Sequence, residues 1–396
     1  MITVEEAKQI LIENVFELTE SQSIETNNAL GFTLAEDIYS PLDLPPFDQS
    51  NVDGYAVKSS NKGNNSWKVI SEIKAGDIAA LELNNSEAIR IFTGAMVPEN
   101  ASCVIMQEKI TRTENQITCE ETELKLGEHI RKKGSQIKAG ELAIKKHTII
   151  NPSVIGFIST LGLKEIQVYR KPKIKLIITG NELQQPGITL TPGKVYESNS
   201  LSLKAALASM GLEIETILFV KDEKENLAKA VDNAMKNTDL LLISGGISVG
   251  DYDYVNEVLK ENNTTTLFYK IAQKPGKPLF FGKNKQTFVF GLPGNPASAL
   301  TCFYEYVYPC IRKLQGRNDL FLSTLFLPTE QDITKKKGLA NFLKAQTSTS
   351  GVLSLEGQES FKMRSFTDAN AFIYLPLEKE NSMKGDMVEV HLLPVF

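Results

Sequence analysis

The stretch DLLLISGGISVGDYDY, residues 239–254, joins an apolar run to a loop with three glycines and two serines. An apolar run that ends in such a loop is typical of a strand buried on both faces of a parallel sheet. The backbone N–H groups of the loop could cradle an anion such as phosphate. The same loop carries Asp251 and Asp253, whose charges would repel that anion. The stretch therefore predicts a strand-end site that combines anion-binding groups with acids.

Strands and helices alternate on both sides of this stretch, which predicts parallel βαβ units. Because parallel strands need a helical crossover on either face, we expect a doubly wound, three-layer α/β/α domain with a mostly parallel sheet. The expected strands are 174–178, 214–220, 239–243 and TFVFGL at 287–292, and the expected helices are 200–210, 224–236 and 296–314.

The rest of the chain predicts a multidomain α/β and β protein. Thr3 and Glu6 form a capping box before a first helix, and a later helix is expected to end at Gly162. Short strands broken by turn residues fill 53–129 and the last eighty residues. The predicted domains are an elongated N-terminal linking unit (1–44 plus 130–170), an inserted small β domain (45–129), the α/β domain (171–316) and a C-terminal β-barrel-like domain (317–396).

Composition excludes several classes of protein. The chain has 396 residues and a formal net charge of -5, which argues against non-specific nucleic-acid binding. The start MITVEEAKQILIENV has no signal-peptide pattern, and no apolar run is long enough to span a membrane. The four cysteines show no CxxC pairing, so we expect reduced cysteines and a cytoplasmic protein. With three scattered histidines, any metal is expected on oxygen ligands, which suits magnesium.

Four loops follow the predicted strands: ITGNEL, VKDE, SGGISVGDYD and GLPGNPASA. In an open parallel sheet the carboxyl ends of the strands converge, and ligands bind there. Alternatively, the glycines and prolines could serve as ordinary loop punctuation. Because all four loops fall at such ends, we favour a binding site.

The glycine loop resembles a P-loop without being one. Gly245 and Gly250 have the G-x-x-x-x-G spacing, but Asp251 stands where a P-loop NTPase needs lysine. Two interpretations remain. Either the backbone and Ser248 hold an anion while Asp253 faces a metal or a leaving group, or Asp251 caps the next helix and Asp253 alone is functional. We favour the second for Asp251, because Asp is a common helix N-cap.

Two further loops offer anion-binding groups. KPGKP places Lys274 and Lys277 around a Pro-Gly turn, with Lys270 shortly before it, and such lysines suit phosphates or another dianion. GLPGNPA fixes a rigid loop before a helix whose free N–H groups could also bind an anion. The alternatives are a solvated turn with surface lysines and a simple rigid turn.

Taken together, SGGISVGDYDYV, KIAQKPGKPLFFG and FGLPGNPASA resemble the molybdopterin molybdenumtransferase family, which includes the E domain of gephyrin. PPFDQSNVDGYAV, IFTGAMVP and IITGNEL resemble it as well, so the likeness spans the whole chain in order. The resemblance implies insertion of molybdate into the dithiolene of adenylylated molybdopterin, with release of AMP and help from Mg²⁺ or Zn²⁺. It also implies a homodimer whose cleft combines the α/β domain of one subunit with the β insertion of the other, and an upstream adenylyltransferase as partner.

The resemblance carries functional residues over motif by motif. Glu182 and Asp253 are the expected metal ligands. The resemblance also explains why the glycine loop combines anion-binding groups with acids, because the phosphates of the substrate and a metal ion would share one cleft. The alternatives for two of these acids are a turn-forming Asp53 and a helix-capping Asp222. The expected catalytic residues are Asp53, Glu182, Asp222, Asp253, Lys270 and Lys274; the expected substrate-binding residues are Thr93, Ser244, Gly245, Gly246, Ser248, Gly250, Lys277, Pro293, Gly294, Asn295 and Pro296.

Three positions depart from the family pattern. Gln136 in IRKKGSQIKAG stands where the family has an acid, Asn181 replaces the Asp of TGDEL, and Lys344 stands where we expect an arginine. These departures keep a second hypothesis open, in which the chain is a catalytically weak scaffold or peptide-binding protein like the E domain of gephyrin. Retention of Asp253, Glu182 and both KPGKP lysines favours the enzyme.

Overall fold

The computed structural model describes residues 1–58, 65–120, 123–247 and 254–394. The chain forms two compact units. The larger unit comprises residues 1–24, 31–35 and 167–396, and the smaller unit comprises residues 25–30 and 36–166. The four-part division expected from the sequence stays a prediction.

The larger unit is built on a six-stranded sheet of order β16-β13-β17-β21-β20-β18. The first four strands are parallel, and β20 runs antiparallel to both of its neighbours. The mostly parallel sheet expected from the apolar runs is therefore confirmed, with an antiparallel strand near one edge. The strands are β16 (Ile214–Val220), β13 (Ile174–Thr179), β17 (Leu240–Ser244), β21 (Thr287–Leu292), β20 (Phe280–Asn284) and β18 (Thr265–Tyr269).

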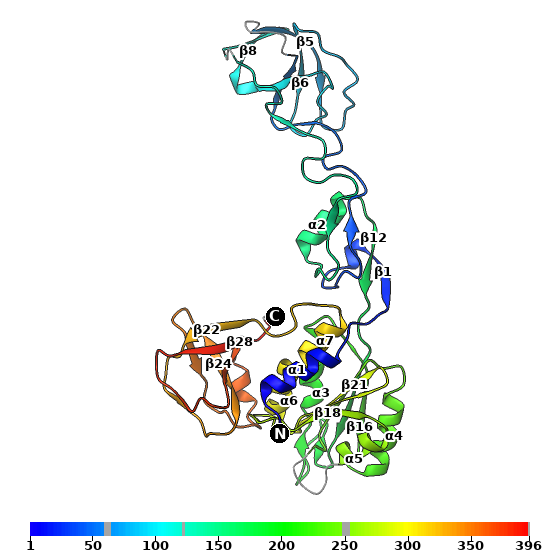
Figure 1. Ribbon diagram of the computed structural model, residues 1–396, viewed down its shortest axis with the longest axis vertical. Coiled ribbons are helices and arrows are strands. Elements are labelled where there is room, and N and C mark those ends of the chain that lie inside the picture. Colours follow the sequence, from blue (N-terminus) through cyan, green and yellow to red (C-terminus); the bar gives the residue numbers. More distant parts are fainter. Residues whose placement is uncertain (59–64, 121–122, 248–253, 395–396) are drawn as a thin grey trace. The chain divides into compact units, whose positions relative to one another are not determined.

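Helices cover both faces of this sheet, as the three-layer prediction required (Figure 1). On one face α4 (Lys224–Ala234) and α5 (Tyr254–Glu261) pack on the apolar side chains of the central strands. The opposite face is covered by α3 (Asn199–Ala208), α6 (Pro296–Cys302), α7 (Tyr308–Leu314) and the N-terminal α1 (Val4–Asn14). Both faces of the strands are thus apolar, which explains their uninterrupted hydrophobic sequences.

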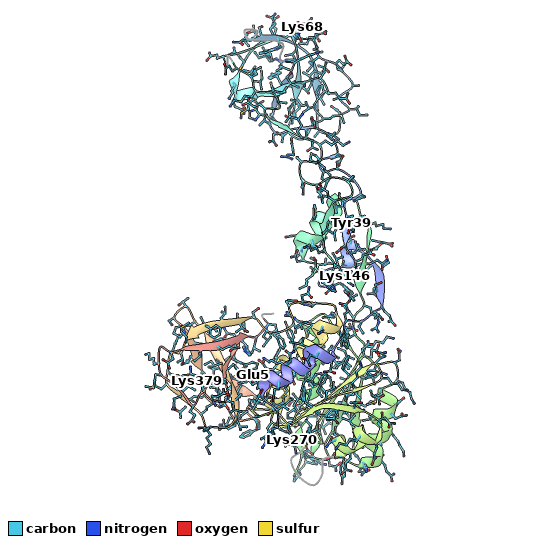
Figure 2. The ribbon with its side chains drawn as sticks, in the orientation of Figure 1. Glu5, Tyr39, Lys68, Lys146, Lys270 and Lys379 are labelled. Atoms are coloured by element: carbon cyan, nitrogen blue, oxygen red, sulfur yellow. The ribbon has the colours of Figure 1, made fainter. Side chains whose placement is uncertain are left out.

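The capping box predicted for α1 is present. The amide of Glu6 donates to Oγ1 of Thr3 at 3.1 Å, and the amide of Thr3 donates to Oε2 of Glu6 at 2.8 Å. Glu5, labelled on α1 in Figure 2, accepts a hydrogen bond from the hydroxyl of Tyr374 in the C-terminal sheet. One helix therefore connects the α/β sheet to the C-terminal β region.

The helix expected over 296–314 contains a π-helical turn, η3 (Phe303–Val307), between α6 and α7. The amide of Tyr308 bonds to the carbonyl of Phe303, five residues back. Pro309 lacks an N–H group and cannot donate to the carbonyl four residues earlier, which favours a local departure from α geometry. The turn directs Glu305 and Tyr306 into the interior, where both are buried.

A cluster of buried charges surrounds Glu305. Lys8 Nζ lies 2.7 Å from one carboxylate oxygen of Glu305, and Nδ1 of His391 lies 2.7 Å from the other. Burial alone would raise the pKa of Glu305, but the charges of Lys8 and His391 outweigh it and lower this pKa to about 2. Burial alone would lower the pKa of His391, but Glu305 and Glu389 raise it to about 9. The cluster joins α1, η3 and the last strand of the chain.

The C-terminal β region is a sheet of order β19-β24-β26-β28-β22 with β25 paired to β24. Its first strand, β19 (Gln273–Lys274), comes from the KPGKP loop of the α/β region and pairs in parallel with β24. The others are β24 (Ala340–Thr347), β26 (Ala371–Leu375), β28 (Met387–Leu392), β22 (Thr324–Pro328) and β25 (Val352–Ser354).

The smaller unit contains a six-stranded sheet of order β7-β4-β6-β5-β9-β8, with an apolar cluster on each face. The short strands expected between 53 and 129 are therefore present. Helix α2 (Pro152–Thr160) is capped by Asn151 and followed by Gly162 at φ 74°, as expected from the sequence. The strands are β7 (Cys103–Met106), β4 (Gly54–Val57), β6 (Glu87–Ile91), β5 (Ser66–Ile73), β9 (Gln116–Cys119) and β8 (Ile110–Thr113).

Short elements complete both units. Among the helices that the structure describes, none has the length and apolar character needed to cross a bilayer. The remaining elements are β1 (Ser21–Glu25) with β12 (Glu165–Tyr169), β2 (Ile38–Tyr39) with β11 (Leu142–Ile144), β3 (Gln49–Ser50) with β10 (Ile130–Arg131), β14 (Leu183–Gln184) with β15 (Val195–Tyr196), β23 (Ile333–Thr334) with β27 (Asn381–Ser382), and the 3₁₀ turns η1 (Thr26–Asn28), η2 (Gln107–Lys109) and η4 (Arg364–Phe366).

Candidate active site

A cavity of about 480 Å³ lies at the carboxyl ends of β13, β17 and β21 in the larger unit. The loops that follow these three strands meet at its wall, which is the convergence that the strand order predicts. Apolar side chains, including Ile178, Ile247 and Phe361, line part of it. The expected site residues in its wall are Glu182, Ser244, Gly245, Pro293, Gly294, Asn295 and Pro296.

The glycines after β17 allow a close approach between two strand ends. A Cβ atom on Gly245 would lie 1.9 Å from the carbonyl oxygen of Thr179, and Gly245 has φ +95°. Gly246 has φ +63°, and a Cβ there would lie 2.9 Å from Val255 and 3.3 Å from Oδ1 of Asp222. A side chain is therefore excluded at Gly245 and strained at Gly246, and the backbone stays uncovered beside the cavity.

Two carboxylates lie close to each other at this edge. Oδ1 of Asp222 accepts a hydrogen bond from Oγ1 of Thr179 at 3.2 Å, and the backbone amide of Asp222 donates to Oδ1 of Asn181 at 3.1 Å. Burial and the negative charge of Glu182 raise the pKa of Asp222. Asn181 thus holds the loop of Asp222, a role that needs an amide or carboxylate oxygen but no charge.

The electrostatic repulsion between Asp222 and Glu182 fits a hard divalent cation, because carboxylate oxygens are the ligands that Mg²⁺ prefers. Within the described ranges no group of three His, Cys, Asp or Glu side chains converges as metal ligands would. Asp253, the other expected ligand, lies outside the described residues, together with Asp251, Ser248 and Gly250. The metal assignment stays a prediction.

The KPGKP loop is tied down by its own backbone. The amide of Lys270 donates to the carbonyl of Leu279 at 3.2 Å, and the amide of Ile271 donates to the carbonyl of Lys277 at 3.0 Å. Lys274 and Lys277 are exposed, and Pro278 of the same loop lines the cavity. Figure 2 labels Lys270 directly after β18, where its ammonium nitrogen lies 4.8 Å from the ring centre of Tyr269. The lysines thus stand on a fixed loop that borders the cavity.

Asp53 and Thr93 lie in the smaller unit, where they contact each other. Oδ1 of Asp53 accepts hydrogen bonds from the amide of Thr93 at 2.8 Å and from its hydroxyl at 2.9 Å. These two bonds, together with the charge of Arg90, lower the pKa of Asp53. Their expected contribution to the cleft stays a prediction. Gln136 is also in this unit, with an exposed side chain and a backbone bond to the carbonyl of Leu44.

Lys344 is a buried lysine in β24 with an exposed fraction of 3%. Its ammonium group donates to the carbonyls of Gly357 at 2.7 Å and Lys362 at 2.9 Å. Burial lowers its pKa. Between the two carbonyls lies a loop that reaches the cavity: Ser360 Oγ accepts a hydrogen bond from the side-chain amide of Asn295 at 2.9 Å, and Phe361 lines the wall. Lys344 therefore fixes part of the cavity wall from behind.

Sequence reasoning missed two buried residues in this wall, Glu197 and Asn199, as well as Phe361. Asn199 donates from its amide nitrogen to Oγ of Ser244 and to the carbonyl of Gly294, both at 2.8 Å. Its sequence signal was an Asn at the start of a predicted helix, which is typical of an ordinary cap. Its place between two strand-end loops becomes visible only in the fold.

Three protein-family models together match most of the chain, in order. Residues 2–162 match the MoeA N-terminal region (domain I and II), residues 175–313 a molybdopterin-binding domain family, and residues 327–393 the MoeA C-terminal region (domain IV). The molybdopterin molybdenumtransferase of Haemophilus influenzae is 33% identical over 405 residues, covering 99% of this chain and 100% of the relative. The chain belongs to the molybdopterin molybdenumtransferase family.

Other members of the molybdopterin molybdenumtransferase family agree in sequence and in structure. The Staphylococcus epidermidis enzyme of that name is 32% identical over 401 residues, covering 99% of this chain and 95% of its own. A crystal structure of the molybdopterin biosynthesis MoeA protein from Pyrococcus horikoshii superposes with a TM-score of 0.85 at 32% identity over all of both chains. A second structure of that protein gives 0.87 at 27% identity, covering 99% of this chain and 100% of its own. The expected family and fold class are confirmed.

Proposed function

We propose that the chain is a molybdopterin molybdenumtransferase that inserts molybdate into the dithiolene of adenylylated molybdopterin and releases AMP. The observation that carries this proposal is the cavity at the strand ends, where Gly245 and Glu182 line the wall and Asp222 lies beside Thr179 and Gly246 at the same edge. An anionic substrate with a pyrophosphate bond requires both kinds of group. The names of full-length relatives support the same reaction.

Each group in the site has a role that its chemistry suits. The amide of Gly246 would bind a phosphate oxygen, since that of Gly245 donates to the carbonyl of Leu292, and the KPGKP lysines would attract the anionic substrates as point charges. Asp222 and Glu182, with Asp253, would hold Mg²⁺ in preference to Zn²⁺, because all three are hard oxygen ligands. A bound Mg²⁺ would neutralise phosphate charge during cleavage of the pyrophosphate bond.

The decisive experiment measures AMP released from adenylylated molybdopterin with and without molybdate. We expect release that depends on molybdate and on Mg²⁺. Binding of the pterin without any AMP release would contradict the enzyme and favour the scaffold hypothesis. Tungstate in a parallel reaction would show which oxyanion the cleft prefers.

The assembly is part of the same proposal. We infer a homodimer in which Asp53 and Thr93 of one subunit complete the cleft of the other, because these residues pair with each other in the smaller unit while the strand-end cavity belongs to the larger unit. Sedimentation at micromolar concentration should give a dimer, and a monomer would contradict the inference.

The substrate itself implies an upstream adenylyltransferase as partner. The four buried free cysteines suit the reducing cytoplasm.

A further inference from the structure

Asn199 has a carboxamide oxygen, in the wall of the strand-end cavity, to which none of the described residues donates a hydrogen bond. The residue is the first of α3 and has an exposed fraction of 7%. Its Oδ1 atom is buried and makes no hydrogen bond within the described part of the chain. Because buried polar atoms in proteins are nearly always paired, such an acceptor at a binding cavity indicates a missing donor.

The orientation of this amide follows from its neighbours. Nδ2 of Asn199 lies 2.8 Å from the carbonyl oxygen of Gly294, which can accept a hydrogen bond but cannot donate one. The nitrogen must therefore face Gly294, and the oxygen must face away from it. Nδ2 also donates to Oγ of Ser244 at 2.8 Å, so both of its hydrogens are used. The amide cannot flip without losing the bond to Gly294.

The turn before α3 holds Asn199 in place. The carboxylate of Glu197, which is 2% exposed, accepts hydrogen bonds from the amide of Ser200 at 2.8 Å and from the hydroxyl of Ser200. Glu197 thereby caps the helix that begins at Asn199. With its backbone fixed by the cap and its amide nitrogen fixed by two strand-end loops, Asn199 presents its oxygen at a defined position.

The donor that this oxygen needs is restricted by the chemistry of the substrate. Phosphates, molybdate and the dithiolene sulfurs offer no strong donor at neutral pH. The donors that the substrate does offer are the ribose hydroxyls, the ring N–H groups of the pterin, and the exocyclic amino groups of the pterin and the adenine, of which the amino groups project farthest from the ring edge. We propose that Asn199 Oδ1 accepts a hydrogen bond from a heterocyclic amino group of the substrate and thereby selects a ring that carries it. This inference rests on the proposed function.

Two pairs of probes test the proposal on the full-length protein. Pterin and lumazine differ by replacement of the 2-amino group with a carbonyl, and AMP and inosine monophosphate differ in the same way at position 6. Each replacement places an acceptor against Oδ1. We expect the wild-type protein to prefer the amino member of one pair by about 10-fold or more in dissociation constant. That pair identifies which ring Asn199 contacts.

Asn199→Ala should abolish the preference within that pair. If Asn199 has a purely structural role, Asn199→Ala would weaken the binding of both members equally and leave the ratio of their dissociation constants unchanged. That result would overturn the proposal. If Asn199→Ala does not fold, Asn199→Ser, whose shorter side chain keeps a hydroxyl donor but places no oxygen at the position of Oδ1, should likewise lose the preference. Binding of all four probes without preference in the wild type would overturn this inference alone. No binding of either pterin or AMP would overturn the proposed function with it.

Discussion

The hydroxyl of Tyr306 donates a hydrogen bond to Oε1 of Gln273, and both side chains are buried. The amide nitrogen of Gln273 donates in turn to the carbonyls of Pro275 and Gly276, at 3.1 Å and 3.2 Å. Gly276 has no room for a side chain, since a Cβ atom would lie 2.3 Å from Sγ of Cys302. The π turn of the helix therefore supports the loop that presents Lys274.

Tyr306→Phe should destabilise the protein by about 1–3 kcal/mol, because it leaves a buried acceptor on Gln273 unpaired. It should also weaken capture of the anionic substrate at low concentration while leaving the rate at saturation nearly unchanged, since the proposed role of the KPGKP lysines is to attract that substrate. Denaturant unfolding and a KM-against-kcat comparison measure the two effects. Tyr304→Phe, which removes the same atom from the same turn, is the matched control. Equal effects of both variants would count against the Tyr306–Gln273 relationship.

Asp222→Asn should lower the affinity for Mg²⁺ at least 10-fold, because it removes one of the two carboxylates that repel each other at the cavity edge. Folding should be little affected, since Asn retains an oxygen for the hydroxyl of Thr179. Calorimetric titration with Mg²⁺ alone measures the change. Glu223→Gln alters a neighbouring exposed acid and should bind as the wild type does. An unchanged Mg²⁺ affinity in Asp222→Asn would remove Asp222 from the metal site.

The Glu305 cluster should make stability depend on pH. The folded-state pKa of His391, about 9, lies above its ordinary value of 6.5, so its contribution is complete below pH 6.5 and is lost as pH rises through 9. The folded-state pKa of Glu305, about 2, lies below 4.5, so its contribution is complete above pH 4.5 and is lost as pH falls towards 2. The two contributions overlap between pH 4.5 and 6.5, where the cluster stabilises most.

His391→Asn should therefore flatten the fall in unfolding free energy between pH 6.5 and 9, a change on the order of 3 kcal/mol. Lys8, Glu305 and Glu389 remain as the charges that face this position. Urea unfolding at a series of pH values gives the profile. A wild-type profile that is flat over this range would refute the assignment to His391.

Lys344→Met keeps the aliphatic stem of the lysine but removes the donor to the carbonyls of Gly357 and Lys362. We expect a loss of about 1–3 kcal/mol in stability and faster amide hydrogen exchange across 357–362. Lys362→Met is the control, since Lys362 forms an exposed ion pair with Glu359 that is worth little. If exchange in the loop does not change in Lys344→Met, Lys344 does not fix the cavity wall.

The sheet could be predicted from the sequence because a continuous apolar run marks a buried strand without reference to distant residues. The strands at 174–178, 214–220 and 239–243 have continuous apolar runs, and the order of strands and helices placed their loops at one edge. The antiparallel strand β20 was not predicted, because its direction depends on pairing with β21 rather than on its own sequence. The π turn was missed for a related reason: the buried position of Glu305 depends on Lys8, 297 residues away.

The residues of the candidate site also fall into those that the sequence predicts and those that only the fold reveals. Glycines, prolines and lysines in recognisable loops could be read directly, and several of them meet at one cavity. Asn199 could not, because an Asn at a helix start has an ordinary explanation and its contacts come from Ser244 and Gly294, up to 95 residues distant. Lys344 drew attention as a departure from the family, but its support of the 357–362 loop depends on contacts that the sequence does not reveal.

The pairing of β19 with β24 has a consequence for how this protein can be recombined. Gln273 and Lys274 lie in register with Ala340 and Asn341, so the edge of the C-terminal sheet is completed by the segment that carries Lys274 of the KPGKP loop. The last eighty residues are therefore not an exchangeable module. A chimera that takes this region from a relative should function only if residues 270–279 are transplanted from the same parent, because this segment supplies the edge strand of the C-terminal sheet.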